Sequence, residues 1–290
     1  MEGAVEPGTN GSAPPPLTIV GWLWRQEKSA IEYTPERANV WARMIDRHLK
    51  IPHRFVLMTD QPEAAFDPLI EARPLWDDWR ELRNPNWAAS KPHCYVRLKA
   101  FSEEARETFG PRFVSIDLDC VVVGNLDPLF QRSEDFLIYQ RGRGPVRDPH
   151  NTYNGSMWLM TAGARAQVWN EFQGEASIAA AAGYLGTDQG WVRHVLGPGE
   201  KGWNPLDGVW AWTQIRYDAR FKKDPPPGAR IVFFQGGQKP WNFKTDPPPA
   251  VTCQQCGASV PIPAPPPWSV TWSQPATSNA ASSWIVKNYQ

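Results

Sequence analysis

The chain has 290 residues, which is enough for one large α/β domain or two small ones. Its 30 basic and 30 acidic residues cancel, so the net charge favours neither nucleic acid nor an anionic membrane as a partner. No apolar run approaches the roughly 18 residues of a membrane span, and residues 1–16 lack the apolar core of a signal peptide. We therefore expect a protein without a transmembrane segment that stays in the cytoplasm.

Strand-like apolar runs alternate with helix signals along most of the chain. In the first half we expect a strand at 17–24, a helix that begins at Thr34 and Pro35, a strand at 54–60, an irregular segment at 61–92 and a helix at 93–108. In the second half we expect strands at 112–119, 136–140, 153–160 and 230–234, a short helix from Asp127, and helices at 164–172 and 187–196. This alternation predicts an α/β fold with a mainly parallel central sheet flanked by helices.

Two aspartates one residue apart, Asp117 and Asp119, follow the apolar run at 112–116. In an extended strand the side chains at positions i and i+2 point to the same side, so both carboxylates would converge while Leu118 turns into the core. Ligands of parallel α/β sheets bind at the carboxyl ends of the strands, which is where this pair falls. Two converging carboxylates suit Mg²⁺ or Mn²⁺, so the sequence predicts a divalent cation site at this edge of the sheet.

Five short segments with distinctive residues follow one another in the chain. They are residues 95–101, residues 116–119 together with 123–129, the strand 153–160 that contains Asn154, the triplet Thr187-Asp188-Gln189, and residues 233–241, which end in Lys239-Pro240-Trp241. Together they resemble nucleotide-sugar glycosyltransferases of the Rossmann-like GT-A fold, close to the family 8 galactosyl- and glucosyltransferases and their bacterial and phage relatives. The resemblance covers roughly residues 17–241 and implies a single GT-A domain.

The resemblance implies a metal-dependent hexosyltransferase with a nucleotide-diphosphate sugar as donor, UDP being the expected nucleotide. The acceptor would be a glycan, a protein or another hydroxyl compound. Breaking the bond to the diphosphate requires a cation that stabilises the negative charge of the leaving group. Asp119 would bind this Mn²⁺ or Mg²⁺ directly, and Asp117 would share it or hold the ribose. The resemblance also favours retention of the anomeric configuration.

Further residues take their expected roles from the same resemblance. Arg97 would hold the donor sugar or a phosphate, and Lys239, after the glycines that begin with Gly236, would reach the diphosphate. Asn154 and Asp188 would hydrogen-bond sugar hydroxyls next to the anomeric carbon. Gln189 would lie close by.

One position departs from the family pattern. Relatives usually place a histidine just before the glycine of the last segment, as a third protein ligand of the metal. Phe233, Phe234 and Gln235 stand there in this chain. Gln235 could offer its amide oxygen, which Mn²⁺ and Mg²⁺ accept. We therefore expect a weaker or water-completed metal site.

Two other functions stay open at this point. A sugar nucleotidyltransferase would need a glycine-rich phosphate loop after the first strand, and residues 21–34 contain only Gly21, which counts against it. A non-catalytic sugar-binding protein on a degenerate transferase scaffold would explain the missing histidine and the 16 tryptophans, whose rings suit sugar faces as well as cores. Sugar binding that persists in EDTA, without donor hydrolysis, would favour the non-catalytic sugar-binding protein.

The composition changes after Trp241. We expect a disordered leader at 1–16, the glycosyltransferase domain at 17–245 and a tail rich in proline and serine at 246–290. The tail could stay loose or fold back over the donor site through Trp268, Trp272, Trp284 and Tyr289. It also contains Cys253 and Cys256, which have the spacing of half a zinc site but no matching second half, so we expect free thiols there.

Overall fold

The computed structural model describes residues 15–25, 32–85, 94–140, 152–184, 187–221, 224–243, 250–252, 259–261 and 283–290. Among these ranges no helix is long and apolar enough to cross a membrane. Cys253, Cys256, Trp268 and Trp272 lie outside them, as do residues 1–14 of the expected leader.

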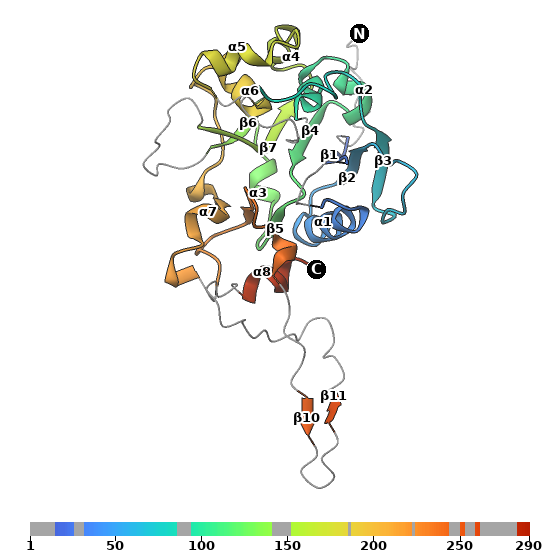
Figure 1. Cartoon of the computed structure of the whole chain (residues 1–290), viewed down its shortest axis with the longest axis vertical. Helices are drawn as coiled ribbons and strands as arrows, with labels where there is room; N and C mark the ends of the chain where they lie inside the picture. Colours follow the sequence, from blue (N-terminus) through green and yellow to red (C-terminus); the bar gives the residue numbers. More distant parts are fainter. Residues whose placement is uncertain are drawn as a thin grey trace, which may run out of the picture.

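A mixed six-stranded sheet forms the centre of the molecule, in the order β3-β2-β1-β4-β7-β6 (Figure 1). The strands are β1 (Leu17–Leu23), β2 (His53–Thr59), β3 (Ile70–Pro74), β4 (Arg112–Ile116), β6 (Phe136–Gln140) and β7 (Tyr153–Thr161). The first four strands in this order pair in parallel, and β7 runs antiparallel to both β4 and β6. The expected α/β class with a mainly parallel sheet is confirmed.

Each face of this sheet carries its own hydrophobic cluster. Helix α1 (Pro35–His48) begins after Thr34, whose hydroxyl accepts the Arg37 N–H, and buries Trp41 and Ile45 against one face. The 3₁₀-helix η1 (Tyr95–Phe101), α2 (Ala105–Phe109), α4 (Gln167–Asn170), α5 (Ala176–Ala181) and α6 (Asp188–Leu196) cover the other face. Consecutive residues of β1, such as Ile19 and Val20, belong to opposite clusters because successive side chains of a strand point to opposite faces.

A second, three-stranded sheet links the centre of the chain to a late segment. Its order is β5-β9-β8, from β5 (Cys120–Val122), β9 (Ile231–Phe233) and β8 (Val209–Ala211). Cys120 pairs with Phe233, so the residue directly after Asp119 lies opposite the segment that leads to Lys239. The remaining elements are α3 (Asp127–Phe130), η3 (Pro205–Asp207), α7 (Trp212–Ile215), η4 (Ala219–Phe221), η5 (Pro240–Asn242), the antiparallel pair β10 (Ala250–Thr252) and β11 (Ser259–Pro261), and α8 (Ser283–Asn288).

Several local expectations need correction. The helix expected at 93–108 is divided into η1 and α2, because the backbone of Ser102 is extended, with φ −69° and ψ 159°. Strand β3 lies inside the segment that was expected to be irregular. For the tail the sequence left two arrangements open, and here Trp284 and Ile285 of α8 are buried in the core, so residues 283–290 pack onto the domain.

Candidate functional site

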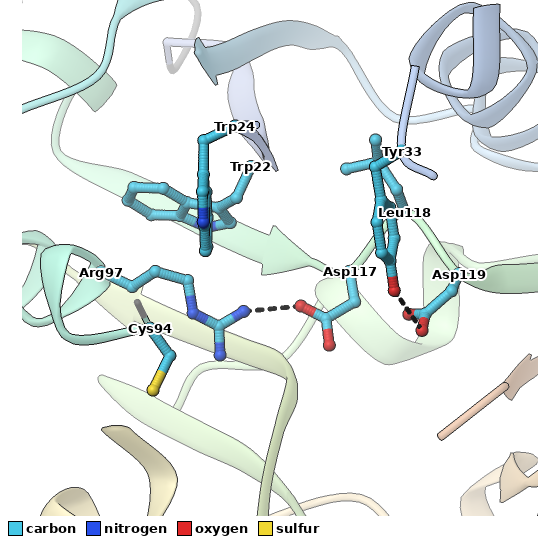
Figure 2. Close-up of a pocket in the computed structure, with 8 residues that line it drawn as sticks. All are labelled: Trp22, Trp24, Tyr33, Cys94, Arg97, Asp117, Leu118 and Asp119. Atoms are coloured by element: carbon cyan, nitrogen blue, oxygen red, sulfur yellow. Dashed lines mark hydrogen bonds and ion pairs between the residues drawn. The ribbon is translucent and has the colours of Figure 1, made fainter. Parts of the chain in front are cut away.

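The two aspartates lie on a bend that joins the two sheets. β4 ends at Ile116, and the backbone N–H of Asp117 donates to the carbonyl of Ser156 in β7 over 2.9 Å. The carbonyl of Asp119 accepts the N–H of Phe234 over 2.8 Å, at the end of β9. Since β4 ends at Ile116 and β5 begins at Cys120, residues 117–119 form a bend between the two strands, yet both carboxylates line one cavity of about 180 Å³ (Figure 2).

Arg97 on η1 holds two of the carboxylates of this region. Its Nη1 donates to Oδ1 of Asp117 over 2.6 Å, and its Nε donates to Oδ2 of Asp188 over 2.7 Å. Its Nη2 donates to the carbonyl of Gly155 over 3.2 Å, and the guanidinium lies 5.3 Å from the centre of the Trp158 ring. Burial opposes the charge of Arg97, but the two aspartates outweigh it and raise the pKa of the guanidinium. Arg97 is therefore a fixed cation at the edge of the cavity.

Asp119 is held by Lys239 and Tyr33. Oδ2 of Asp119 accepts the Tyr33 hydroxyl over 3.0 Å and also contacts Nζ of Lys239, which donates in addition to the carbonyl of Phe234 over 2.9 Å. Both Asp119 and Lys239 are buried. Burial raises the pKa of the Asp119 carboxyl, and the nearby ammonium only partly opposes this. Burial and the neighbouring carboxylates also raise the pKa of the Tyr33 phenol, which keeps it a donor.

The sugar-contact residues expected from the sequence lie next to Arg97. Asp188 is the first residue of α6, which is capped by the Thr187 hydroxyl. Oε1 of Gln189 accepts the N–H of Gly155 over 2.8 Å. Oδ1 of Asn154 accepts the N–H of Ser156 over 2.9 Å, while its Nδ2 is buried and has no hydrogen-bond partner among the described residues. Asn154 is 1% exposed and does not line the cavity, so this donor lies behind the cavity wall.

Gly155 allows Arg97 to approach β7 closely. A Cβ atom at this position would lie 2.6 Å from Nη2 of Arg97 and so exclude the observed rotamer. The Asn-Gly sequence of the third motif therefore has a packing reason: the asparagine is presented on the strand, and the glycine leaves room for the arginine.

A divalent cation has suitable oxygen ligands here, although Lys239 competes for one of them. Within the described ranges no cluster of three or more His, Cys, Asp or Glu side chains could hold a metal. No described residue donates to Oδ2 of Asp117 or Oδ1 of Asp119. Both side-chain amide atoms of Gln235 are buried without a partner, although Gln235 does not line the cavity. The two free carboxylate oxygens suit a cation that prefers oxygen ligands, whereas the amide of Gln235 lies outside the cavity that they line.

Four residues of the cavity wall were not singled out from the sequence: Trp22, Trp24, Tyr33 and Cys94. Trp24 extends into the cavity opposite Arg97 (Figure 2), and its indole N–H is buried without a partner among the described residues. The position of the two tryptophans at the end of the first strand was a usable signal, since ligands bind at strand ends. The sequence around Tyr33 gave no signal of a site role, because its contact with Asp119 joins residues 86 positions apart.

Two solved structures share the architecture of this chain. One is the galactosyltransferase LgtC in complex with donor and acceptor sugar analogues, and the other is an active-site mutant of LgtC in which a glutamine is replaced by glutamate. The chain has the GT-A fold. Each comparison gives a TM-score of 0.50 at 12% sequence identity and covers 78% of this chain and 89% of the LgtC chain. No protein-family model matches the chain, and no curated protein sequence does.

Proposed function

We propose that this protein is a glycosyltransferase that moves a hexose from a nucleotide-diphosphate sugar, with UDP as the nucleotide, to a hydroxyl acceptor. One observation carries the proposal: two buried cations, Arg97 and Lys239, meet three carboxylates beside a cavity at the carboxyl end of β4. Charged side chains are costly to bury, so such a cluster facing a cavity is a candidate site for a charged ligand. The GT-A fold supports a sugar-nucleotide ligand.

The charges of the cluster explain why the donor would bind together with a metal. The cluster has one negative charge in excess, from Asp117, Asp119 and Asp188 against Arg97 and Lys239. A diphosphate alone would add to this excess, and a divalent cation would offset it. Asp117 and Asp119 would hold Mn²⁺ or Mg²⁺, which supplies charge stabilisation to the departing diphosphate.

Lys239 would exchange one partner for another when the donor binds. Its ammonium donates to the Asp119 carboxylate in this structure. A lysine ammonium has three donors on a flexible side chain, so it can turn towards a phosphate oxygen. Gly236, with φ +81°, lies three residues before Lys239, and no atom lies within 4 Å of the position that a Cβ would take there. This open backbone leaves room for a phosphate to approach.

The sugar would lie on the β7 side of the cavity. Asn154 has a free buried donor, and Asp188 and Gln189 lie at the start of α6 beside it. Sugar hydroxyls need both donors and acceptors, and this group provides carboxylate, amide and guanidinium functions within a short distance of Arg97. The resemblance favours retention, and no described side chain is placed as a nucleophile, so we propose a same-face displacement assisted by the leaving phosphate.

One observation favours a second candidate, a sugar-binding protein without transferase activity. The Lys239 ammonium already neutralises Asp119, and the group of ligating side chains is smaller than a typical metal centre. In that case sugar would bind through Asn154, Asp188 and the cavity tryptophans, and metal would be irrelevant.

Calorimetric titration of UDP with and without Mn²⁺, followed by mass spectrometry of a donor panel, tests the proposal. We expect binding that requires Mn²⁺ in the unchanged protein and is lost in Asp119→Asn, with slow donor consumption or transfer. Asp77→Asn is the matched control, because the Asp77 side chain is 97% exposed. Sugar binding that is unaffected by EDTA, without donor consumption, would instead support the second candidate. Absence of any nucleotide or sugar binding would refute both.

A further inference from the structure

Helix α8 is built into the core next to the candidate site. Trp284 and Ile285 on the helix and Tyr289 just after it are buried. The indole N–H of Trp284 donates to the carbonyl of Phe221 over 3.2 Å, and Arg47 of α1 donates to the carbonyl of Asn288 over 3.3 Å. Figure 1 shows α8 below β5 and beside α1. These contacts fix the segment 283–290 against the domain.

Two of the elements that α8 contacts directly follow the two members of the buried ion pair. It packs against β5, which begins at Cys120 directly after Asp119. It also packs against η5, which begins at Pro240 directly after Lys239. One short helix therefore supports both backbone segments that carry the Asp119–Lys239 pair, although these residues are 120 positions apart in the chain.

A row of aromatic rings runs from Tyr289 to the Asp119 carboxylate. The ring centres of Tyr289 and Trp241 lie 6.0 Å apart, and those of Trp241 and Tyr33 lie 5.3 Å apart in an edge-to-face arrangement. The Tyr33 hydroxyl then donates to Asp119, and the Lys239 ammonium lies 5.7 Å from the centre of the Tyr33 ring. The Tyr289 and Trp241 rings are tilted by 41° and in contact, while the Trp241–Tyr33 pair has the edge-to-face geometry that aromatic rings prefer. Loss of the Tyr289 ring would therefore free Trp241 to move, and with it Tyr33.

We propose that Tyr289 is a positioning residue of the candidate site: through Trp241 it orients the Tyr33 phenol, and the phenol in turn fixes the Asp119 carboxylate. This also gives a role to Trp241, the last residue of the Lys-Pro-Trp segment. The consequence for donor binding rests on the function proposed above. The effect on the Tyr33 hydrogen bond does not.

The first test measures the Tyr33 phenol directly by NMR of protein labelled with ¹³C at the ζ carbon of tyrosine, whose shift responds to hydrogen bonding of the hydroxyl. The chain has 7 tyrosines, and Tyr33→Phe assigns the relevant signal by its disappearance. We expect Tyr289→Ala to shift the Tyr33 signal and Tyr289→Phe, which keeps the ring, to leave it in place. An unchanged Tyr33 signal in Tyr289→Ala would overturn the proposal.

The second test measures UDP binding with Mn²⁺ in the same variants. We expect Tyr289→Ala to weaken binding about tenfold, in line with typical energetic coupling between residues of a packed network, and Tyr289→Phe to bind normally. Lys287→Ala is the control on the same helix, because Lys287 is exposed. If the unchanged protein binds no nucleotide, the proposed function fails while the NMR result still decides the positioning role.

A milder variant covers the case in which Tyr289→Ala does not fold. Arg47→Ala removes only the contact with the Asn288 carbonyl at the end of α8. We expect a smaller shift of the Tyr33 signal in Arg47→Ala, and a folded Arg47→Ala protein with an unmoved Tyr33 signal would also count against the proposal.

Discussion

Arg97 and Arg165 each bridge two carboxylates, and the surroundings of the two groups differ. Arg97 joins Asp117 and Asp188 beside the cavity, with only 9% of its side chain exposed. Arg165 joins Glu200, through two parallel hydrogen bonds of 2.6 and 2.9 Å, and Asp135, whose side chain is 60% exposed. The Arg165 group lies where β6 begins, on the side of the sheet away from the carboxyl end of β4.

The comparison separates the hydrogen-bond geometry of a charged group from the free-energy cost of burying its charges. Arg165 has the better hydrogen-bond geometry, and its partner Glu200 is largely buried, with 16% of the side chain exposed. Arg165 itself is 19% exposed and Asp135 is 60% exposed, so water screens this group more than the Arg97 group, and screening weakens an ion pair. The Arg97 group has lost most of its hydration, so its charges depend on each other, and removing one partner leaves the others uncompensated. Charges withdrawn from water and facing a cavity are the ones that a charged ligand can use.

The largest expected effect is that of Arg97→Met. It leaves Asp188 buried without its cation, so we expect the free energy of unfolding to fall by about 3–5 kcal/mol and the proposed transferase activity to be lost. Urea unfolding and a donor-consumption assay measure the two effects. A stable protein with unchanged turnover would show that the buried group is neither structural nor part of the site.

Asp188→Asn should have the next largest effect, because it keeps the shape of the side chain and removes its charge. We expect kcat/KM for the donor to fall about 10- to 100-fold, the value of one hydrogen bond to a charged group. Steady-state kinetics with the donor identified in the panel check this. An equal loss for Glu200→Gln would contradict the distinction between the two arginine groups.

For Arg165→Met we expect a smaller loss in the free energy of unfolding than for Arg97→Met, because Asp135 and part of Arg165 reach water, and no change in kcat/KM. Here the measurement is urea unfolding in parallel with Arg97→Met, at the same ionic strength. A loss as large as that of Arg97→Met would mean that hydrogen-bond geometry outweighs burial in this protein.

The smallest effect concerns Glu134, near the Arg165 group. Its carboxylate accepts two hydrogen bonds from Arg132, of 3.1 and 2.7 Å, and this pairing lowers its pKa from 4.5 to about 2. A carboxylate whose pKa is lowered by folding stabilises the protein above its unfolded-state pKa, and the gain is lost as the pH falls from about 4.5 towards 2. Glu134→Gln should therefore lose less stability than the unchanged protein over this range.

Urea midpoints at neutral pH and at several pH values within this window measure the difference. Glu63→Gln is a control, since Glu63 is exposed. Parallel acid curves for the unchanged protein and Glu134→Gln would contradict the expectation.

The elements that the sequence predicted best are those with strong hydrophobic periodicity. β1, β2 and α1 were placed within a residue or two, because each has a buried face and α1 also has the Thr34 cap. β3 could not be found in this way: of its residues only Ile70 is buried, so the segment has no apolar alternation. The break at Ser102 was also invisible, because the apolar residues on both sides of it continue the same stripe.

The candidate site was predictable where motifs are local. Asp117, Asp119 and the triplet 187–189 follow recognisable strand and helix signals, and Arg97, Asn154 and Lys239 came from the resemblance. The contacts among them depend on the tertiary structure: the strand argument placed both aspartates on one extended strand, whereas they lie on a bend and have different partners. The roles that the resemblance implies for these residues stay predictions.

The small sheet β5-β9-β8 has a consequence for how the protein is made. The central strands β1, β2 and β4 can pair when less than half of the chain has been synthesised, but the Asp119–Lys239 contact closes a loop of 120 residues. Contacts of such long range form slowly and late, because ordering the intervening chain costs entropy before the contact compensates it. A nascent chain that ends before residue 230 would contain the strands of the central sheet but not Lys239, the partner of Asp119. Ligand binding would therefore be a stricter test of complete folding of this domain than its secondary-structure content.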